Sequence, residues 1–375
     1  MRPVGRGAIL RSVARDIGID SGGRGRLFRG VVSVADPLVS VVLPVCNGAA
    51  TLPRAIATIA GQTLRNWELV IVENGSTDGT GALAEAAAVG DPRVRVLGLP
   101  ERGLVPALNA GLAAARGALI ARMDADDVAA PERLERQAAF LLAPENRGIG
   151  LVGCGVEFGG DRAAQAGYAR HVDWLNALAT PEAIALHRFV ESPLAHPSTM
   201  FRRELVSQFG GYRDGAFPED YELWLRWLDA GVRMAKVPQV LLTWADLPGR
   251  LSRTDPRYAP EAFFRLKAQW LARELKRRVG PRRLLVWGAG RPTRKRAAWL
   301  EREGIAIDGY VDIDPKKISP AMGGTGRPVL APEQLPEPTD VFVAVYVAKR
   351  GARELIAAEL EERGFRAGRD YLLAA

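Results

Sequence analysis

The sequence predicts an α/β fold built around parallel strands. From position 39 onward, short runs of aliphatic residues alternate with helical segments over about 100 residues, a pattern typical of parallel strands joined by right-handed crossovers. The alternation restarts at Arg282, and a length of 375 residues allows two domains. We expect four segments: a basic tail over 1–36, a main domain over 37–255, a linker helix over 256–280 and a second α/β domain over 281–375.

The composition narrows the class of protein. Hydrophobic residues make up 47% of the chain and charged residues 25%, which is ordinary for a globular protein. No apolar run approaches the roughly 20 residues of a membrane span, the N-terminus lacks the apolar core of a secretory signal, and two cysteines are too few for a disulfide framework. We therefore expect a cytoplasmic protein, with peripheral contact at the inner face of the cell membrane left open.

The charge balance bears on the partners. Lys and Arg number 51 against 43 acidic residues, a formal net charge of +8, but the two signs are intermixed. We expect attraction to anionic small molecules or a membrane surface, and no nucleic-acid binding.

The first half of the chain supplies the strands of the main sheet. Val39–Val45 is a continuous apolar run, which suits a strand buried on both faces. Further strands are expected at 67–72, 94–97 and 118–123. Helices are expected to begin near positions 52, 79, 104 and 131.

Three carboxylates follow the fourth of these strands. Asp124, Asp126 and Asp127 come directly after an apolar run and before Pro131, and in open α/β sheets ligands bind beyond the carboxyl ends of the strands. Carboxylates this close repel one another unless a cation holds them. Mg²⁺ and Mn²⁺ prefer oxygen ligands and commonly share them with substrate phosphates. The motif predicts a metal–diphosphate site; the alternative is a solvated acidic turn that caps the next helix.

Several ordered blocks of the sequence carry a family resemblance. They are VSVVLPVCNG (39–48), ENGSTDGT (73–80), LNAGL (108–112), MDADD (123–127), HPSTMFRR (196–203), FGGYR (209–213) and PEDYELWLR (218–226). Together they resemble family 2 glycosyltransferases with the GT-A fold, over residues 37–255. The resemblance implies an inverting, hexosyltransferase-like enzyme of cell-surface polysaccharide or glycolipid synthesis. Its donor would be a nucleoside-diphosphate sugar, with a UDP-sugar foremost, and its acceptor a saccharide or a lipid-linked sugar.

The resemblance also implies a role for individual residues. Asp124 is expected near the ribose and the metal, Asp126 as a direct ligand of Mn²⁺ or Mg²⁺, and Asp220 as the general base that takes the acceptor's proton. The nucleotide and the other parts of the substrates would be bound by Pro44, Val45, Asn47, Glu73, Asn74, Asn109, Asp124, Glu219 and Arg250.

The sequence departs from the family pattern at two places. Glu73-Asn74 stands where an acidic pair is usual, which puts the base-reading residue in doubt. Leu247 stands where related enzymes often place a metal-binding histidine. The metal would then rely on Asp126, water and phosphates, or take Asp246 as a substitute.

Simpler structural roles compete with several of these assignments. Glu219 and Asp220 fall in the first turn of an expected helix, where carboxylates are favoured by the helix dipole. Trp224, Trp227 and Trp244 are candidates for an acceptor site, but aromatic residues at helical spacing are more often core, and we expect this of Trp227. A structural role is also expected for His196.

The second domain resembles a small Rossmann-type unit. Gly288 and Gly290 lie between a strand and a helix, where a phosphate could meet a helix N-terminus, and Asp312 falls where a ribose-binding acid would lie. A third glycine is missing, so we expect a structural or regulatory module.

Two other functions remain open for the whole chain. One is a nucleotide-sugar-binding module with weakened chemistry, and the other is a nucleotide-dependent sugar oxidoreductase run by the second domain.

Overall fold

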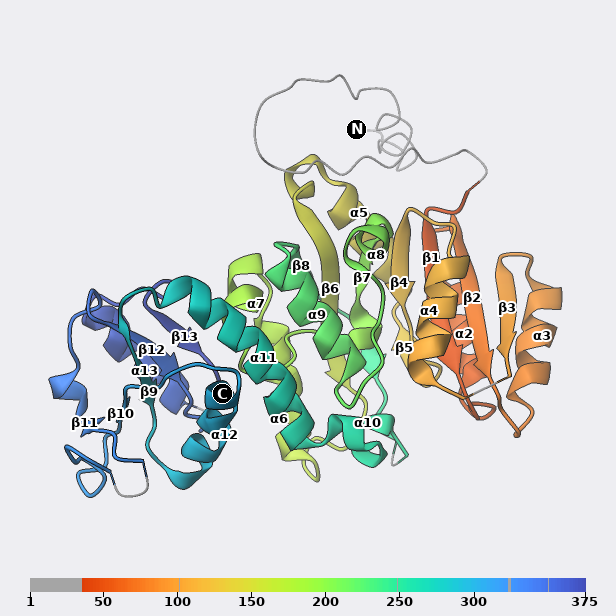
Figure 1. Cartoon of the computed structure of the whole chain (residues 1–375). Helices are drawn as coiled ribbons and strands as arrows, with labels where there is room; N and C mark the ends of the chain where they lie inside the picture. The colour runs from red at the N-terminus through yellow and green to blue at the C-terminus, as the bar shows by residue number, and fades with distance from the viewer. Residues whose placement is uncertain (1–35, 101, 248, 323–324, 350) are drawn as a thin grey trace.

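The computed structural model describes residues 36–375 except 101, 248, 323–324 and 350. The expected tail over 1–36 lies outside the described residues except for its last residue, Asp36. The described part contains two sheets, and the long helix α11 (Pro260–Arg278) runs between them (Figure 1).

The larger sheet has eight strands in the order β3-β2-β1-β4-β7-β6-β8-β5. The strands β3, β2, β1 and β4 pair in parallel in this order. The next strand, β7, pairs antiparallel with both β4 and β6. The fold is therefore α/β with a mostly parallel sheet, as predicted. The strands are β1 (Val39–Val45), β2 (Trp67–Asn74), β3 (Val94–Leu99), β4 (Leu119–Arg122), β5 (Val128–Ala129), β6 (Ile149–Phe158), β7 (Met200–Arg202) and β8 (Arg233–Trp244).

Helices cover both faces of this sheet. Alternate residues of β1 separate to the two sides: Val41 joins a core with Leu52 and Ile59 of α2, whereas Val42 joins a core with Leu108 of α4. This explains why the β1 segment is continuously apolar. The helices of this region are α2 (Leu52–Ala60), α3 (Thr80–Gly90), α4 (Leu104–Ala114), α5 (Arg133–Leu142), α6 (Ala166–Ala177), α7 (Pro181–His187), α8 (Glu204–Phe209), α9 (Glu219–Asp229) and α10 (Leu251–Thr254).

The smaller sheet is entirely parallel. Its five strands have the order β11-β10-β9-β12-β13. The strand β10 is short and covers only Gly309–Val311. The elements are β9 (Arg283–Trp287), α12 (Arg291–Arg302), β10, β11 (Val329–Leu330), β12 (Val341–Val345), α13 (Ala352–Glu362) and β13 (Tyr371–Leu373).

The two sheets are joined through a common hydrophobic core. Tyr221 and Leu225 of α9 belong to one buried cluster with Leu271 of α11 and with Leu284 and Phe342 of the smaller sheet. Burial of this kind stabilises a contact by roughly 25 cal/mol per Å² of apolar surface. The smaller sheet is therefore packed firmly against the elements that carry the site.

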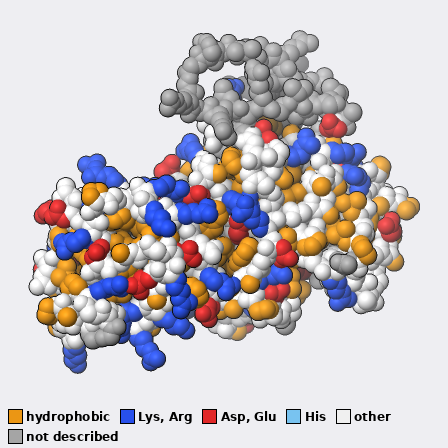
Figure 2. Space-filling view, in the orientation of Figure 1, with side chains coloured by type: hydrophobic (Ala, Val, Ile, Leu, Met, Phe, Trp, Pro, Cys, Tyr) orange, Lys and Arg blue, Asp and Glu red, His pale blue; other side chains and the backbone are white. Residues whose placement is uncertain are grey.

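The surface shows mixed charge. Figure 2 shows Lys and Arg side chains distributed over this face with Asp and Glu among them. Within the described part of the chain, none of the helices combines the length and apolar character needed to cross a bilayer.

Candidate active site

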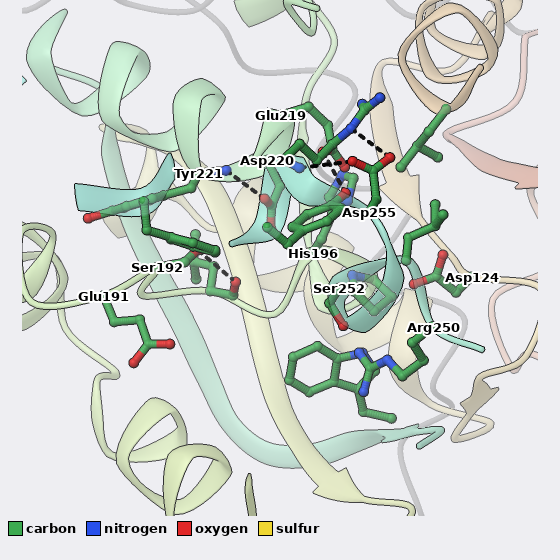
Figure 3. A pocket seen from close by; sticks show the side chains of 18 of the residues that line it. Asp124, Glu191, Ser192, His196, Glu219, Asp220, Tyr221, Arg250, Ser252 and Asp255 are labelled. Atoms are coloured by element: carbon green, nitrogen blue, oxygen red, sulfur yellow. Dashed lines mark hydrogen bonds and ion pairs between the residues drawn. The ribbon is translucent and has the colours of Figure 1, made fainter. Parts of the chain in front are cut away.

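A large open cavity lies at the carboxyl ends of β1 and β4. Its volume is about 1360 Å³, and Asp124, Asp126 and Asp220 all line it. Figure 3 shows Asp124 on one side of Asp220 and Glu191 on the other. Acids from distant parts of the chain thus reach a single cavity.

The acidic group after β4 has the composition of a divalent-metal site. Carboxylate oxygens of Asp124, Asp126 and Asp127 lie within 4.8 Å of one another. Burial and the nearby charge of Asp124 raise the pKa of Asp126, and raise the pKa of Asp127 still further. Asp127 Oδ1 accepts a 2.8 Å hydrogen bond from the Ala245 amide, while its buried Oδ2 finds no partner among the described residues. An all-oxygen donor set with an orphaned oxygen fits Mg²⁺ or Mn²⁺.

Asp246 is not part of this acidic group. Its carboxylate forms ion pairs with Arg253 at 2.6 Å and with Arg250 at 3.5 Å. Burial works against its charged form, but hydrogen bonds from Arg253 and Gln165 lower the pKa of Asp246 overall. Leu247 beside it is exposed. Asp246 Oδ2, like Asp127 Oδ2, is buried without a hydrogen-bond partner among the described residues. Both expected arrangements of the metal therefore stay predictions, and only the β4 carboxylates lie close enough together to share an ion.

A buried arginine links the two acidic sides of the cavity. Arg122, the last residue of β4, forms an ion pair with Asp124. Its charge also acts favourably on the carboxylates of Asp126, Glu219 and Asp220. Its Nε has no hydrogen-bond partner among the described residues. Arg122 is thus the cation that allows so many carboxylates to converge.

Asp220 has the electrostatic character of a base. It lies at the start of α9, and its Oδ1 accepts a 2.7 Å hydrogen bond from the Tyr221 amide. Burial and the adjacent charge of Glu219 raise the pKa of Asp220 to about 7. A carboxylate with a raised pKa accepts a proton more readily near neutral pH, so the surroundings of Asp220 are compatible with a base as well as with a helix-capping residue.

Glu219 precedes Asp220 in α9 and also lines the cavity. It is buried, and Tyr258 donates a 2.6 Å hydrogen bond to its Oε2. Burial raises the pKa of Glu219 as well.

The aromatic and histidine candidates divide between core and cavity. Trp224 and Trp227 are both fully buried in the core, so the acceptor-site alternative is wrong for them, while Trp244 lines the cavity. His196 Nε2 lies 2.6 Å from the Tyr212 hydroxyl, and burial holds the pKa of His196 well below its usual range. His196 is therefore neutral and structural, as expected, although it borders the cavity.

The expected nucleotide-binding residues fall into two groups. Pro44, Val45, Asn47 and Asn74 line the cavity. The side-chain carbonyl of Asn47 accepts a 2.8 Å hydrogen bond from the Thr77 amide. The side-chain carbonyl of Asn74 accepts a 3.1 Å hydrogen bond from the Gly103 amide. These contacts hold the loops after β1, β2 and β3 together at the cavity edge.

Glu73 and Asn109 do not line this cavity. Glu73 Oε1 accepts a 2.6 Å hydrogen bond from the Ser76 amide inside its own turn. The Asn109 amide donates to the Tyr212 carbonyl at 2.9 Å and accepts from the Tyr212 amide at 3.0 Å. Both polar groups are occupied by the backbone. The expectation that these two side chains contact the nucleotide stays a prediction, and these contacts do not favour it.

Arg250 lies on the metal side of the cavity (Figure 3). Its guanidinium lies 4.6 Å from the centre of the Trp244 ring and pairs with Asp246. It also acts favourably on the charge of Asp126. A cation here suits the diphosphate that Asp126 would help to bind through a metal.

Several residues of the cavity were not predicted from the sequence. Arg122 could have been suspected, because an arginine stands within an apolar strand two positions before Asp124. Tyr258, Lys267 and Arg296 also line the cavity. They come from α11, from the segment before it and from α12, and no local motif marks them.

The expected C-terminal acid is occupied by its own loop. Asp312 Oδ2 accepts a 2.8 Å hydrogen bond from the Ala289 amide, and Oδ1 accepts one of 3.0 Å from the Asp314 amide. Lys317 pairs with the same carboxylate at 3.2 Å. Asp312 thus fixes the glycine loop after β9.

Comparison with known proteins identifies the family. Residues 40–210 match the model of glycosyl transferase family 2. EpsE of Bacillus subtilis is 33% identical over 214 residues, which cover 55% of this chain and 72% of EpsE. AmsE, an amylovoran biosynthesis glycosyltransferase of Erwinia amylovora, is 31% identical over 199 residues, covering 51% of this chain and 69% of AmsE. WbnJ, an O-antigen biosynthesis glycosyltransferase of Escherichia coli, is 26% identical over 248 residues, which cover 64% of this chain and 91% of WbnJ. Because of this similarity, and because an acidic cavity lies at the carboxyl ends of its parallel strands, we conclude that the chain belongs to glycosyltransferase family 2.

Proposed function

We propose that this protein transfers a sugar from a nucleoside-diphosphate sugar, a UDP-sugar foremost, to a hydroxyl group of a saccharide or lipid-linked acceptor. The observation that carries the proposal is the shared cavity, in which the Asp124–Asp126 group and Asp220 are linked by Arg122. The polysaccharide roles in the names of AmsE and WbnJ support a similar role here.

The donor side combines the acidic group and Arg250. Asp124 and Asp126 would hold Mn²⁺ or Mg²⁺, which supplies Lewis-acid stabilisation of the departing nucleoside diphosphate. Arg250 lies beside this group, where its charge would orient the diphosphate. Pro44, Val45, Asn47 and Asn74 would border the nucleoside.

Asp220 would act on the acceptor side. With a pKa of about 7, its carboxylate is a far better proton acceptor than an aspartate in water. It would take the proton from the acceptor hydroxyl as that oxygen attacks the anomeric carbon. Attack from the face opposite the leaving diphosphate inverts the configuration at that carbon.

We infer that residues 37–255 form the GT-A domain, 256–280 the linker helix and 281–375 a Rossmann-like domain. The five-stranded parallel sheet with flanking helices supports this division. Because its acid Asp312 is held by its own loop, a dinucleotide-dependent oxidoreductase is not favoured.

The test is a screen of UDP- and GDP-sugars with Mn²⁺, Mg²⁺ or EDTA. The expected result is metal-dependent binding of one nucleotide sugar, followed by slow release of the nucleoside diphosphate. The departures at Glu73-Asn74 and Leu247 favour a second candidate, a binding module without chemistry. Metal-dependent binding without any release of nucleoside diphosphate, even after acceptor extracts are added, would support that candidate.

A further inference from the structure

The proposed general base has a second buried carboxylate as its neighbour. Glu219 and Asp220 are the first two residues of α9, and both line the cavity (Figure 3). Glu219 is only 2% exposed, whereas Asp220 is partly exposed. Two carboxylates this close do not both lose their protons at the usual pH, because the charge of each disfavours the charge of the other. The chemistry of the pair therefore depends on which carboxylate keeps its proton to the higher pH.

Tyr258 contacts this pair from the linker. Its hydroxyl donates a 2.6 Å hydrogen bond to Glu219 Oε2, and the residue lines the cavity. Burial and the charges of Glu219 and Asp220 raise the pKa of Tyr258, so its hydroxyl keeps its proton and remains a donor. A donor of this kind stabilises the ionised form of the carboxylate that accepts from it. Tyr258 therefore opposes the burial that raises the pKa of Glu219.

The segment that carries Tyr258 is ordered by its own contacts. It is the short 3₁₀-helix η3 (Pro256–Tyr258), which lies between α10 and α11 along the chain. Asp255 caps this helix by accepting a 2.9 Å hydrogen bond from the Arg257 amide, and Pro256 occupies its first position. The Arg257 side chain returns to Asp255, with 3.1 Å between Nε and Oδ2. The backbone on either side of Tyr258 is thus held while its hydroxyl reaches Glu219.

Two further side chains interact with both carboxylates. Arg122 in β4 favours the ionised form of each. The Tyr212 hydroxyl, from the loop before α9, keeps its proton because burial and the nearby charges of Glu219 and Asp220 raise the pKa of Tyr212. These two side chains therefore act on the pair as a whole.

The side chains of η3 act on Glu219. Tyr258 donates to it, and Arg257 adds a favourable charge. The Asp220 carboxylate instead accepts a 2.7 Å hydrogen bond from the Tyr221 backbone amide, while burial and the charge of Glu219 raise the pKa of Asp220 to about 7. The contacts of η3 thus favour charge on Glu219 and leave Asp220 as the place where a proton binds near neutral pH.

We propose that Tyr258 is a positioning residue, which holds Glu219 ionised and thereby makes Asp220 the carboxylate of the pair that accepts the acceptor's proton. This inference rests on the proposed function, in which Asp220 is the base. The acceptor hydroxyl gives its proton to Asp220 as its oxygen bonds to the anomeric carbon, and the nucleoside diphosphate leaves with the electron pair of the broken bond. Without the Tyr258 hydroxyl, Glu219 would keep a proton to higher pH and Asp220 would become a weaker base.

The first test titrates the two carboxylates in the full chain without substrate. The carboxyl carbons of aspartate and glutamate are labelled with ¹³C and followed by NMR through neutral pH, and the signals are assigned with Asp220→Asn and Glu219→Gln. We expect Asp220 to titrate at a higher pH than Glu219. Tyr258→Phe should lower the midpoint of Asp220 by at least about 0.5 pH unit and raise that of Glu219, because a hydrogen bond to a charged group is lost.

Tyr371→Phe is the matched control for this titration. The Tyr371 hydroxyl donates a 2.8 Å hydrogen bond to Glu361 Oε1, and neither residue is among the described residues that line the cavity. The control removes the same kind of contact, so it should leave both midpoints unchanged. Unchanged midpoints in Tyr258→Phe, or an equal shift in Tyr371→Phe, would overturn the proposal.

The pH dependence of turnover is a readout that a purely structural role of Tyr258 would not move. In Tyr258→Phe, kcat should level off at a lower pH and at a lower plateau, because Asp220 ionises more easily and is a weaker base. Glu219→Gln should lower this pH by roughly 1 unit or more, because the neighbouring charge is removed. Adding Tyr258→Phe to Glu219→Gln should cause no further shift, because Tyr258 acts through Glu219. A further shift in the double variant, or a fall in kcat with unchanged pH dependence, would contradict the proposal.

This inference and the proposed function fail separately. If the unmodified chain transferred no sugar from any donor, the proposed function would fail, while the NMR titration would still decide whether Tyr258 controls the protonation of the pair. If transfer occurred but the midpoints stayed unchanged in Tyr258→Phe, only the role of Tyr258 would be lost.

Discussion

Each of the two sheets has an aspartate shortly after the end of one of its strands, but the pKa values of the two aspartates shift in opposite directions. Asp312 follows β10, and Asp126 follows β4. Asp312 accepts two backbone hydrogen bonds and pairs with Lys317, and these contacts outweigh burial to lower the pKa of Asp312. Burial and Asp124 raise the pKa of Asp126. The carboxylate of Asp312 is satisfied by two backbone amides and Lys317, whereas the charge of Asp126 is offset only in part by Arg250 and Arg122.

This difference separates structural acids from functional ones. A strand-end acid in an α/β fold indicates a ligand site only when its neighbours leave its charge uncompensated. By the same criterion Glu73, which is bonded within its own turn, is a weaker candidate for a ligand contact than Asp126.

Large effects on turnover are expected at Asp126 and at Asp220. Asp126→Asn should lower metal-dependent donor turnover by about 10²–10³-fold, because a metal ligand and its transition-state stabilisation are lost. Nucleoside-diphosphate release in Mn²⁺ measures the effect. Asp314→Asn is the control, since Asp314 lies in the loop after β10 and does not line the cavity. Full activity of Asp126→Asn would contradict the metal assignment.

Asp220 should show a comparable loss in turnover but with donor binding intact. Asp220→Asn is expected to reduce transfer by about 10²–10⁴-fold, the usual contribution of a general base. The base must be unprotonated, so in the unmodified enzyme kcat should rise with pH and level off above a pKa of about 7. A pH–rate profile without this limb, or normal turnover of the variant, would remove Asp220 from its role.

Substitution of Asp312 should change the stability of the protein but not its donor turnover. Asp312→Ala removes two hydrogen bonds and an ion pair, and we expect a loss of about 1–3 kcal/mol in the free energy of unfolding. Donor turnover below the melting temperature should stay within about twofold of that of the unmodified enzyme, because Asp312 does not line the cavity and its loss acts through folding. A large loss of donor binding at unchanged stability would show that Asp312 binds a ligand after all.

The smallest effect is expected at Glu73. Glu73→Gln keeps an oxygen that can accept the Ser76 amide, so the nucleotide Kd should change by less than about threefold. Titration of UDP in Mn²⁺ measures it. A tenfold or greater weakening would restore Glu73 as a residue that contacts the base.

The sequence predicted those parts of the molecule that depend on local pattern. The strands β1 and β2, the acidic turn after β4 and the start of α9 follow from apolar runs, prolines and clustered acids within a few residues. The strands β6, β7 and β8 were not predicted, because they depend on pairing across the sheet with partners far along the chain.

The same division holds for the site. Asp124, Asp126 and Asp220 carry motifs and could be named in advance. The inward turn of Glu73 and the pairing of Asn109 with the Tyr212 backbone depend on contacts that no spacing encodes. The cavity residues Lys267 and Arg296 come together only when α11 and α12 pack side by side.

The common core of α9, α11 and the smaller sheet has a practical consequence for anyone who shortens the chain. Cutting after Val279 would keep α11 against α9 but would remove Leu284 and Phe342 from the buried cluster that they share with α11. A loss of activity in such a truncated protein would combine the loosening of this core with the loss of whatever the C-terminal region binds. Point substitutions are therefore the sounder way to learn what each half contributes.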